Sequence, residues 1–193
     1  MTVPDNAWIF DTGPLRHFAE QGWLGVLRFL AGDRPIYIPD TVERELNQAA
    51  DYVPATRMVL DADWISVYRS TDPDFMETLS YYADRLVADS KNLGECGVLT
   101  MGQLFKCEVV IDDAVPRGIA EERGVRVTAT VPLLCAAIRA QKLTTVMVEE
   151  LVDNLLESKY FLPFGPGGFR RHVLENGLLD YEDLEVTFRG MAR

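Results

Sequence analysis

Short apolar runs alternate along this chain with stretches in which apolar residues recur at helical intervals. The runs are four to six residues long and rich in Val, Ile and aromatic residues, which is typical of strands buried on both faces of a sheet. They cover residues 7–10, 35–39, 64–68, 107–112 and 125–128. Because the connections are short, the pattern predicts an α/β fold with a central parallel sheet of about five strands and helices on both faces.

The intervening stretches predict helices. Residues 14–31 begin with Pro14, a residue favoured in a first helical turn, and carry leucines at helical spacing. Residues 40–50 begin with Asp40 three positions before Glu43, the spacing of a capping box. Further helices are expected over residues 75–90, 94–105, 114–124, 132–143, 146–158 and 169–179. We expect a core domain over residues 1–143 and a C-terminal helical extension over 144–193, packed on the same domain.

The net charge of −11 bears on whether the protein binds nucleic acids. A protein whose affinity comes from neutralising phosphates is usually basic. A simple nucleic-acid binder is therefore disfavoured, unless a metal site and a few local cations handle the phosphate. The candidates for such a local patch are Arg16, Arg117, Arg139, Arg170 and Arg171.

Other features of the composition bear on location and metal chemistry. No stretch is long and apolar enough to cross a membrane, and the N-terminus lacks a signal-peptide pattern, so we expect a cytoplasmic protein. The three cysteines are widely spaced in apolar surroundings, which predicts buried free thiols. With two histidines and no CxxC pair, the chain has no ligand pattern for zinc.

Two of the predicted strands end in aspartate. Asp11 closes the first run, and Asp112 and Asp113 close the fourth. In an open parallel sheet, ligands bind outside the carboxyl ends of the strands where the strand order reverses, so neighbouring strands would bring these carboxylates into one crevice. Glu45 and Glu95 on adjacent predicted helices can add two more. Crowded carboxylates raise each other's pKa, and Mg²⁺ or Mn²⁺ would relieve this and could assist phosphodiester hydrolysis.

Most of these carboxylates also have simpler explanations. An Asp after a strand often opens a turn, and Glu95 stands three residues after Asn92, again at capping-box spacing. Asp113 can be the N-cap of the following helix, and Glu43 is better explained as a cap than as a ligand. A phosphatase of the haloacid dehalogenase type is disfavoured, because Gly13 stands where that chemistry needs a second Asp. A dinucleotide-binding domain would need a GxGxxG after the first strand, which is absent.

Four segments, in this order, resemble a PIN domain, the metal-dependent ribonuclease fold of VapC-type toxins and of PIN-related toxin-like proteins of prokaryotes. They are "FDTGPL", "IYIPDTVERE", "LGECGVL" and "VVIDDAVPRGIAEERGVRVTAT". The resemblance covers most of residues 8–143 and, more loosely, the helices to about residue 177. It implies a three-layer α/β/α sandwich and a Mg²⁺- or Mn²⁺-dependent endoribonuclease that cuts RNA. The toxin half of a toxin–antitoxin pair, with an antitoxin partner, and a homodimer are consistent with the family.

Carried over residue by residue, the resemblance assigns roles to seven positions. The implied metal ligands and catalytic residues are Asp11, Glu45, Glu95 and Asp112, with Asp113 as a further ligand or a supporting partner, Thr12 beside the metal, and Arg117 as a contact to phosphate or to the carboxylates. Two departures from the family pattern are Gly97, where a second glutamate is common, and Ile138, near the place of a common lysine. The alternative function is a non-catalytic PIN-like module whose acidic pocket binds a basic partner peptide. The segment "KYFLPFGPGGFRRH" is open to interpretation as a lid, a partner groove or plain packing.

Overall fold

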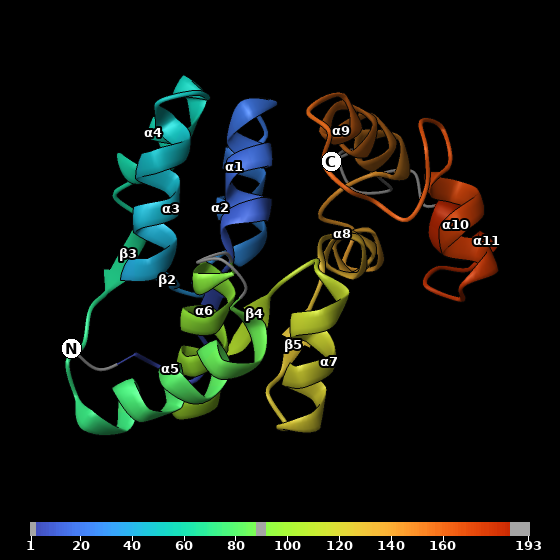
Figure 1. The fold of residues 1–193 in the computed structure, drawn as a ribbon. Coiled ribbons are helices and arrows are strands. Elements are labelled where there is room, and N and C mark those ends of the chain that lie inside the picture. Colours follow the sequence, from blue (N-terminus) through green and yellow to red (C-terminus); the bar gives the residue numbers. More distant parts are fainter. Residues whose placement is uncertain (1–2, 88–91, 186–193) are drawn as a thin grey trace. The chain divides into compact units, whose positions relative to one another are not determined.

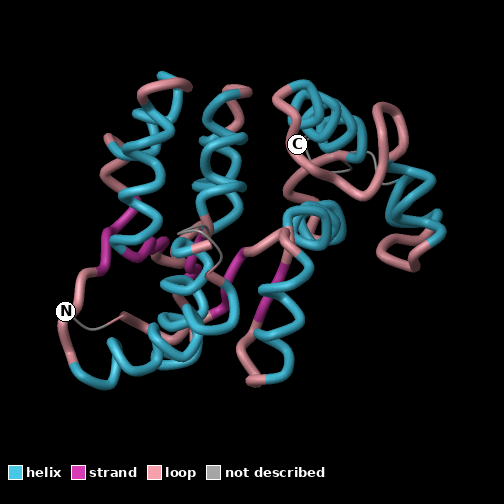
Figure 2. Tube along the Cα trace, in the orientation of Figure 1, coloured by secondary structure: helices cyan, strands magenta, loops and turns pink. Residues whose placement is uncertain are grey.

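The computed structural model describes residues 3–87 and 92–185. The chain divides into two compact units, Met1–Ala129 and Thr130–Arg193 (Figure 1). Every strand in the described part of the chain belongs to the first unit, and the second unit is built from helices (Figure 2). The predicted domain boundary between residues 143 and 144 stays a prediction.

The five strands form one parallel sheet. They are β1 (Trp8–Phe10), β2 (Ile36–Pro39), β3 (Ile65–Tyr68), β4 (Glu108–Val110) and β5 (Val127–Thr128), in the order β3-β2-β1-β4-β5. Each strand lies within one of the predicted apolar runs, so the predicted parallel sheet of about five strands is confirmed. The central strands β1 and β2 are buried along their whole length, as their unbroken apolar sequence requires.

The strand order reverses between β1 and β4. The chain moves outward from β1 through β2 to β3 and then returns to β4 on the other side of β1. Phe10 is paired with Val110, and the amide of Asp11 continues the ladder by donating to the carbonyl of Val110 at 3.1 Å. The segments that follow β1 and β4 therefore emerge side by side at the carboxyl edge of the sheet.

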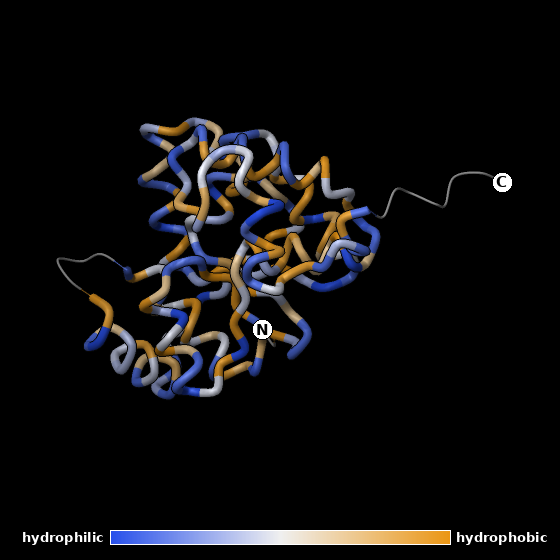
Figure 3. Tube along the Cα trace, turned by 90° about the vertical axis from the view of Figure 1, so that its right-hand side faces the viewer, coloured by the Kyte–Doolittle hydropathy of each residue, from blue (hydrophilic) through white to orange (hydrophobic). Residues whose placement is uncertain are grey.

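Helices flank the sheet in a three-layer α/β/α arrangement. In the first unit they are α1 (Thr12–Glu20), α2 (Leu24–Ala31), α3 (Asp40–Ala50), a 3₁₀ turn (Pro54–Thr56), α4 (Arg57–Leu60), α5 (Pro73–Leu86), α6 (Leu93–Phe105) and α7 (Ala114–Glu122). Residues 94–102 of α6 are all buried, because this helix packs against β1, β2 and β4 as well as α3 and α5. Most other helices alternate hydrophobic and hydrophilic residues, as amphipathic helices do (Figure 3).

Two local predictions for these helices are wrong. The stretch 14–31 is two helices, because Gly22 takes a left-handed conformation (φ +75°) and interrupts the helical path. The capping box at Asp40 does not form, since Asp40 is the first helical residue and Pro39 is the N-cap. Glu43 instead accepts from Arg69 with both carboxylate oxygens at 2.6 Å. The final residues of the helix predicted over 75–90, residues 88–90, lie outside the described residues.

The second unit contains α8 (Thr130–Arg139), α9 (Thr145–Glu157), α10 (Phe169–Glu175) and α11 (Tyr181–Glu185). In its "KYFLPFGPGGFRRH" segment, Tyr160, Leu162 and Phe169 are buried, whereas Lys159, residues 165–167, Arg170 and Arg171 are exposed. The Tyr160 hydroxyl is hydrogen-bonded to Thr130 Oγ1 at 3.1 Å, and buried Phe169 stacks edge-on against Phe164 at 5.9 Å. Of the aromatic side chains in this segment, that of Phe161 is exposed.

Two compositional predictions can be compared with the structure. Cys96, Cys107 and Cys135 are all free and buried, as predicted. Of the helices in the described residues, none combines the length and the apolar character that a membrane span needs.

Candidate active site

Asp11 lies at the point where the strand order reverses. It directly follows β1 and caps α1, with its Oδ2 accepting weakly from the amide of Gly13 at 3.4 Å. Its other oxygen, Oδ1, is buried and has no hydrogen-bond partner among the described residues. Burial raises the pKa of Asp11 well above its ordinary value, and the charges of Glu95 and Glu45 raise it further. A buried hydrogen-bond acceptor without a partner lowers the free energy of unfolding by about 1 to 3 kcal/mol, so Asp11 destabilises the fold.

Glu45 joins three elements of the first unit. It lies on α3, and its Oε2 accepts from the Thr12 hydroxyl, at the start of α1, at 2.5 Å. Its Oε1 accepts from the backbone amide of Gly94, in the first turn of α6, at 2.8 Å. A Cβ on Gly94 would lie 2.5 Å from Glu45 Oε2. Glycine at position 94 therefore leaves the space in which the Glu45 carboxylate is held.

Glu95 is a second buried carboxylate, one residue further along α6. Burial is the main cause that raises its pKa, and the charges of Glu45 and Asp113 add to it. The capping explanation for Glu95 is not supported, because Asn92 makes no side-chain capping bond within the described part of the chain. The Asn92 amide donates to the Leu86 carbonyl at 3.0 Å instead.

The two aspartates after β4 differ in exposure. Asp112 is half-buried, and Asp113 is exposed. Asp113 occupies the N-cap position of α7, but among the described residues its side chain makes no capping bond. Its charge is near enough to Glu95 to raise the pKa of that group. The N-cap interpretation of Asp113 is therefore correct in position only, and its charge acts on Glu95.

Two arginines of the first unit, Arg16 and Arg117, each have a buried Nε that lacks a hydrogen-bond partner among the described residues. Arg117 lies in α7, and its Nε is buried without a partner among the described residues. Arg16 in α1 has a similarly unpartnered Nε, while its Nη2 lies 2.8 Å from His17 Nε2. Burial, followed by the charge of Arg16, lowers the pKa of His17 to about 4, so His17 is neutral at pH 7 and can accept from Arg16.

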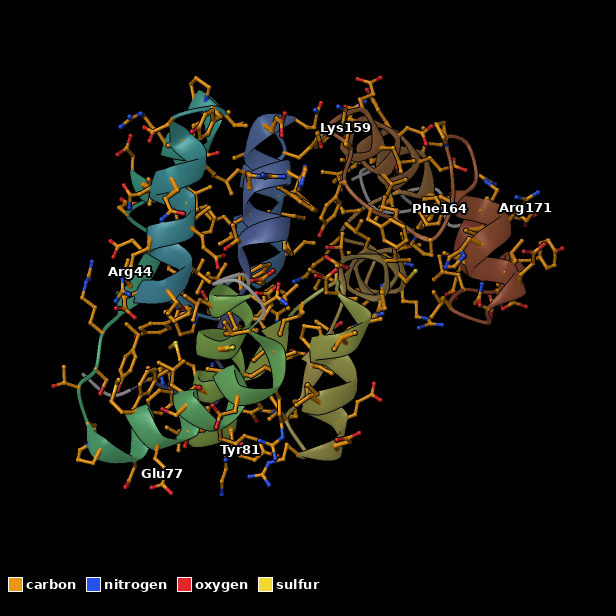
Figure 4. The ribbon with its side chains drawn as sticks, viewed as in Figure 1. Arg44, Glu77, Tyr81, Lys159, Phe164 and Arg171 are labelled. Carbon is orange, nitrogen blue, oxygen red and sulfur yellow. The ribbon has the colours of Figure 1, made fainter. Side chains whose placement is uncertain are left out.

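The remaining candidates for a basic patch lie in the second unit. Arg139 is paired with Asp183 at 3.3 Å, and Arg170 is paired with Glu149 through two bonds of 2.9 and 3.1 Å. Arg171 is exposed at the outer surface of α10 (Figure 4). The charges of Arg139 and Arg170 are therefore neutralised by carboxylates, which makes these two residues weaker candidates for a basic patch than the sequence suggests.

Gly97 explains one departure from the family pattern. A Cβ at this position would overlap Thr41 Oγ1 and would lie 2.9 Å from Pro39 Cβ. These neighbours are a buried β-branched residue and a proline ring, which cannot move aside as the end of a long side chain can. The loss of a glutamate here is therefore coupled to the close packing of α6 on the start of α3. The sequence feature that could have indicated this packing is the pair of glycines, Gly94 and Gly97, in the first turns of one helix.

The donor chemistry of these residues fits a divalent cation. Asp11 supplies a buried carboxylate oxygen without a partner, and the neighbouring negative charges of Glu45 and Glu95 would be relieved by a cation. Within residues 3–87 and 92–185, however, no three His, Cys, Asp or Glu side chains are gathered closely enough to hold a metal ion. Glu45 is committed to Thr12 and Gly94, so the ligand set proposed from the sequence is assembled only in part.

Comparison with known proteins agrees with this architecture. The family model described as "DUF3368: PIN domain" matches residues 7–164, which is most of the chain. A search of curated proteins found no match. The matched range includes all seven candidate site residues and the whole five-stranded sheet. The chain therefore belongs to the PIN domain family, whose fold is of a nuclease type.

Proposed function

We propose that this protein is a metal-dependent endoribonuclease of PIN type, which hydrolyses RNA phosphodiester bonds with Mg²⁺ or Mn²⁺. The observation that carries the proposal is the buried, unpartnered Oδ1 of Asp11 at the point where the strand order reverses. A turn residue would gain nothing from burial beside two glutamates, whereas a metal ligand needs this surrounding. Membership of the PIN domain family supports the choice of a nucleic-acid substrate.

In this proposal the site residues have three different roles: binding the cation, positioning Glu45 and contacting the phosphate. Asp11, Glu95 and Asp112 would hold the cation once its binding draws their carboxylates closer together than they lie here, with exposed Asp113 as a further ligand or supporting partner. Thr12 and Gly94 hold the Glu45 carboxylate through two hydrogen bonds, so that its negative charge stays directed at the site. Arg117 would contact a phosphate oxygen with its guanidinium group or neutralise the carboxylates of the site. A divalent cation supplies Lewis acidity for the attack of water on a phosphodiester and offsets the charge that develops on phosphorus oxygens.

The biological setting is proposed on the family resemblance. The protein would be the toxin of a toxin–antitoxin pair in the cytoplasm, with RNA as its substrate and an antitoxin protein and a second copy of the chain as its partners. The net charge of −11 favours a structured RNA that is recognised locally over one bound along its whole backbone.

The proposal is tested by incubating the full chain with a mixed pool of structured and single-stranded RNAs. Parallel reactions contain Mg²⁺, Mn²⁺ or EDTA, and the products are mapped by sequencing. Cleavage that requires a divalent metal supports the nuclease, and the fragment ends give its specificity. A folded protein that cleaves no RNA, yet gains thermal stability with Mn²⁺ and binds an arginine-rich peptide, would favour the alternative of a non-catalytic module.

Gly94→Ala is expected to lower the cleavage rate by about 10- to 100-fold, the usual cost of disturbing a group that orients metal ligands. The new methyl group would push the Glu45 carboxylate away from Gly94 and Thr12. The measurement is the single-turnover rate of RNA cleavage together with the Tm. Because the displaced atoms are the mobile end of a glutamate, the Tm should change little.

The matched control is Gly25→Ala in α2, where an added Cβ meets nothing within 4 Å. This variant should cleave RNA at the wild-type rate. Equal rates for Gly94→Ala and Gly25→Ala would contradict a role for the position of Glu45 in the reaction.

A further inference from the structure

A second polar region of the first unit is a pocket of about 510 Å³, whose lining includes Asp5, Gln103, Lys106, Arg123 and Arg126. Lys106 stands two residues before β4, Arg126 directly precedes β5, and Asp5 precedes β1. These positions are the amino ends of parallel strands, whereas the candidate active site follows their carboxyl ends. The pocket therefore lies at the opposite edge of the sheet from Asp11.

The guanidinium groups in this pocket are held by neutral groups. Arg126 Nη2 donates to the carbonyl of Asp5 at 2.8 Å and also to the carbonyl of Lys106. Arg123 lies 4.6 Å over the ring of Tyr81, which Figure 4 shows at the lower margin of the first unit. Within the described part of the chain, Lys106, Arg123 and Arg126 form no ion pair with a carboxylate.

Arg34, another arginine of the first unit, differs from the pocket cations because it is paired with a carboxylate. Arg34 also stacks on an aromatic ring, that of Trp8 at 4.2 Å, but its Nη2 is paired with Glu108 at 2.8 Å. Its charge is thereby neutralised within the protein. The pocket cations lack such a carboxylate and keep their charge available to a ligand.

The local charge of the pocket is positive in a protein of net charge −11. Three cations face one carboxylate, that of Asp5. Lys106 and Arg123 are also the C-caps of α6 and α7, and the helix dipole contributes about half a negative charge at each of these ends. The helix ends thus explain part of the basic character, and an excess of about one positive charge remains.

The pocket also offers a neutral donor. Gln103 Oε1 accepts from the Tyr82 hydroxyl at 2.7 Å, which orients the side chain and leaves its amide N–H groups for a ligand. The volume lies within the range of roughly 300 to 1,000 Å³ that small-molecule sites usually have. Arginine forks and a lysine ammonium beside an amide donor are the groups that bind phosphate oxygens.

We propose that this pocket binds the phosphate group of a nucleotide-sized ligand. The inference goes beyond the proposed nuclease and does not depend on it, because it uses none of the site carboxylates. The phosphate can belong to a free nucleotide or to an RNA backbone, and both sources present the same oxygens to Lys106, Arg123 and Arg126.

Two substitutions remove charge from the pocket at side chains that are themselves exposed, although Arg123 also makes a hydrogen bond to buried Tyr82. Lys106 has a left-handed backbone (φ +55°), a conformation that favours glycine, so Lys106→Gly should fold at least as well as the wild type. Arg123→Gln replaces an exposed side chain. The matched control, Arg57→Gln on α4, removes the same charge from an exposed position outside the pocket lining.

The experiment is isothermal titration calorimetry of the full chain in EDTA, which keeps divalent cations from the candidate active site. The probes are ADP, inorganic phosphate and an RNA dodecamer without terminal phosphates. We expect saturable binding to the wild type and to Arg57→Gln. Lys106→Gly and Arg123→Gln should each weaken it about tenfold or more, the effect of losing one charge-assisted hydrogen bond.

The three probes separate the outcomes. Weakened binding of ADP and phosphate in the two pocket variants supports a free nucleotide as the source. Weakened binding of the dodecamer alone supports an RNA backbone. The proposal is overturned if no probe binds, or if binding is unchanged in the variant that combines both substitutions. Because the readout needs neither metal nor cleavage, it can fail while the nuclease proposal holds, and the reverse.

Discussion

Asp11→Asn is expected to abolish metal-dependent RNA cleavage, with a loss of at least about 100-fold, without unfolding the protein. Asparagine keeps the shape of the side chain and the acceptor that caps α1, but it lacks the negative charge that would hold a cation. Burial and the charges of Glu95 and Glu45 already raise the pKa of Asp11, so its ionised form destabilises the fold at neutral pH. Removing that charge should therefore raise the Tm in EDTA, by about 2 to 4 °C for each kcal/mol regained.

Two measurements separate function from stability in this variant. RNA cleavage is followed with Mg²⁺ or Mn²⁺, and thermal unfolding is followed with Mn²⁺ and with EDTA. The wild type should gain Tm with Mn²⁺, since a ligand at 100 times its Kd stabilises the native state by about 2.7 kcal/mol. Asp11→Asn should not gain it.

The matched control is Asp33→Asn, an exposed aspartate away from the site. It should behave as the wild type in both measurements. Full cleavage by Asp11→Asn would rule out the proposed mechanism, and a strongly lowered Tm in EDTA would show that the carboxylate stabilises the fold.

Gly97→Ala is expected to give the largest loss of stability among the predicted variants. Alanine in a helix interior usually gains about 1 kcal/mol over glycine. Here the added Cβ would overlap Thr41 Oγ1 and contact Pro39, and overpacking of this kind typically costs about 1 to 3 kcal/mol. A glutamate would meet the same obstacle at its Cβ, so restoring the family residue should destabilise the protein instead of adding a metal ligand. The measurement is the free energy of unfolding in urea.

Gly118→Ala in the middle of α7 is the control, because a Cβ there meets nothing within 4 Å. It should be neutral or stabilising. Adding Thr41→Ala to Gly97→Ala should recover part of the loss, since the hydroxyl that is overlapped also lacks a partner among the described residues. If Gly97→Ala were as stable as Gly118→Ala, the packing explanation for Gly97 would be wrong.

The sequence alone predicted the sheet and the position of its acidic edge. Each strand is a continuous apolar run, and burial on both faces imposes such a run on any strand in the centre of a parallel sheet. Asp11 and Asp112 could be placed near each other because adjacent parallel strands end at the same edge. The order of four short motifs was enough to indicate the family, which the match over residues 7–164 shows.

The tertiary structure decided which polar groups meet. Glu45 contacts residues that are 33 and 49 positions away in the chain, and no local pattern specifies such partners. A capping box was predicted from spacing at Asp40 and was an alternative explanation for Glu95 at Asn92, yet the helix starts at Asp40 itself in the first case and Asn92 bonds to Leu86 in the second. The basic pocket likewise combines residues before β1, β4 and β5. Local sequence determines periodicity and strand ends, whereas the pairing of charges depends on contacts between distant segments, which exist only once the chain has folded.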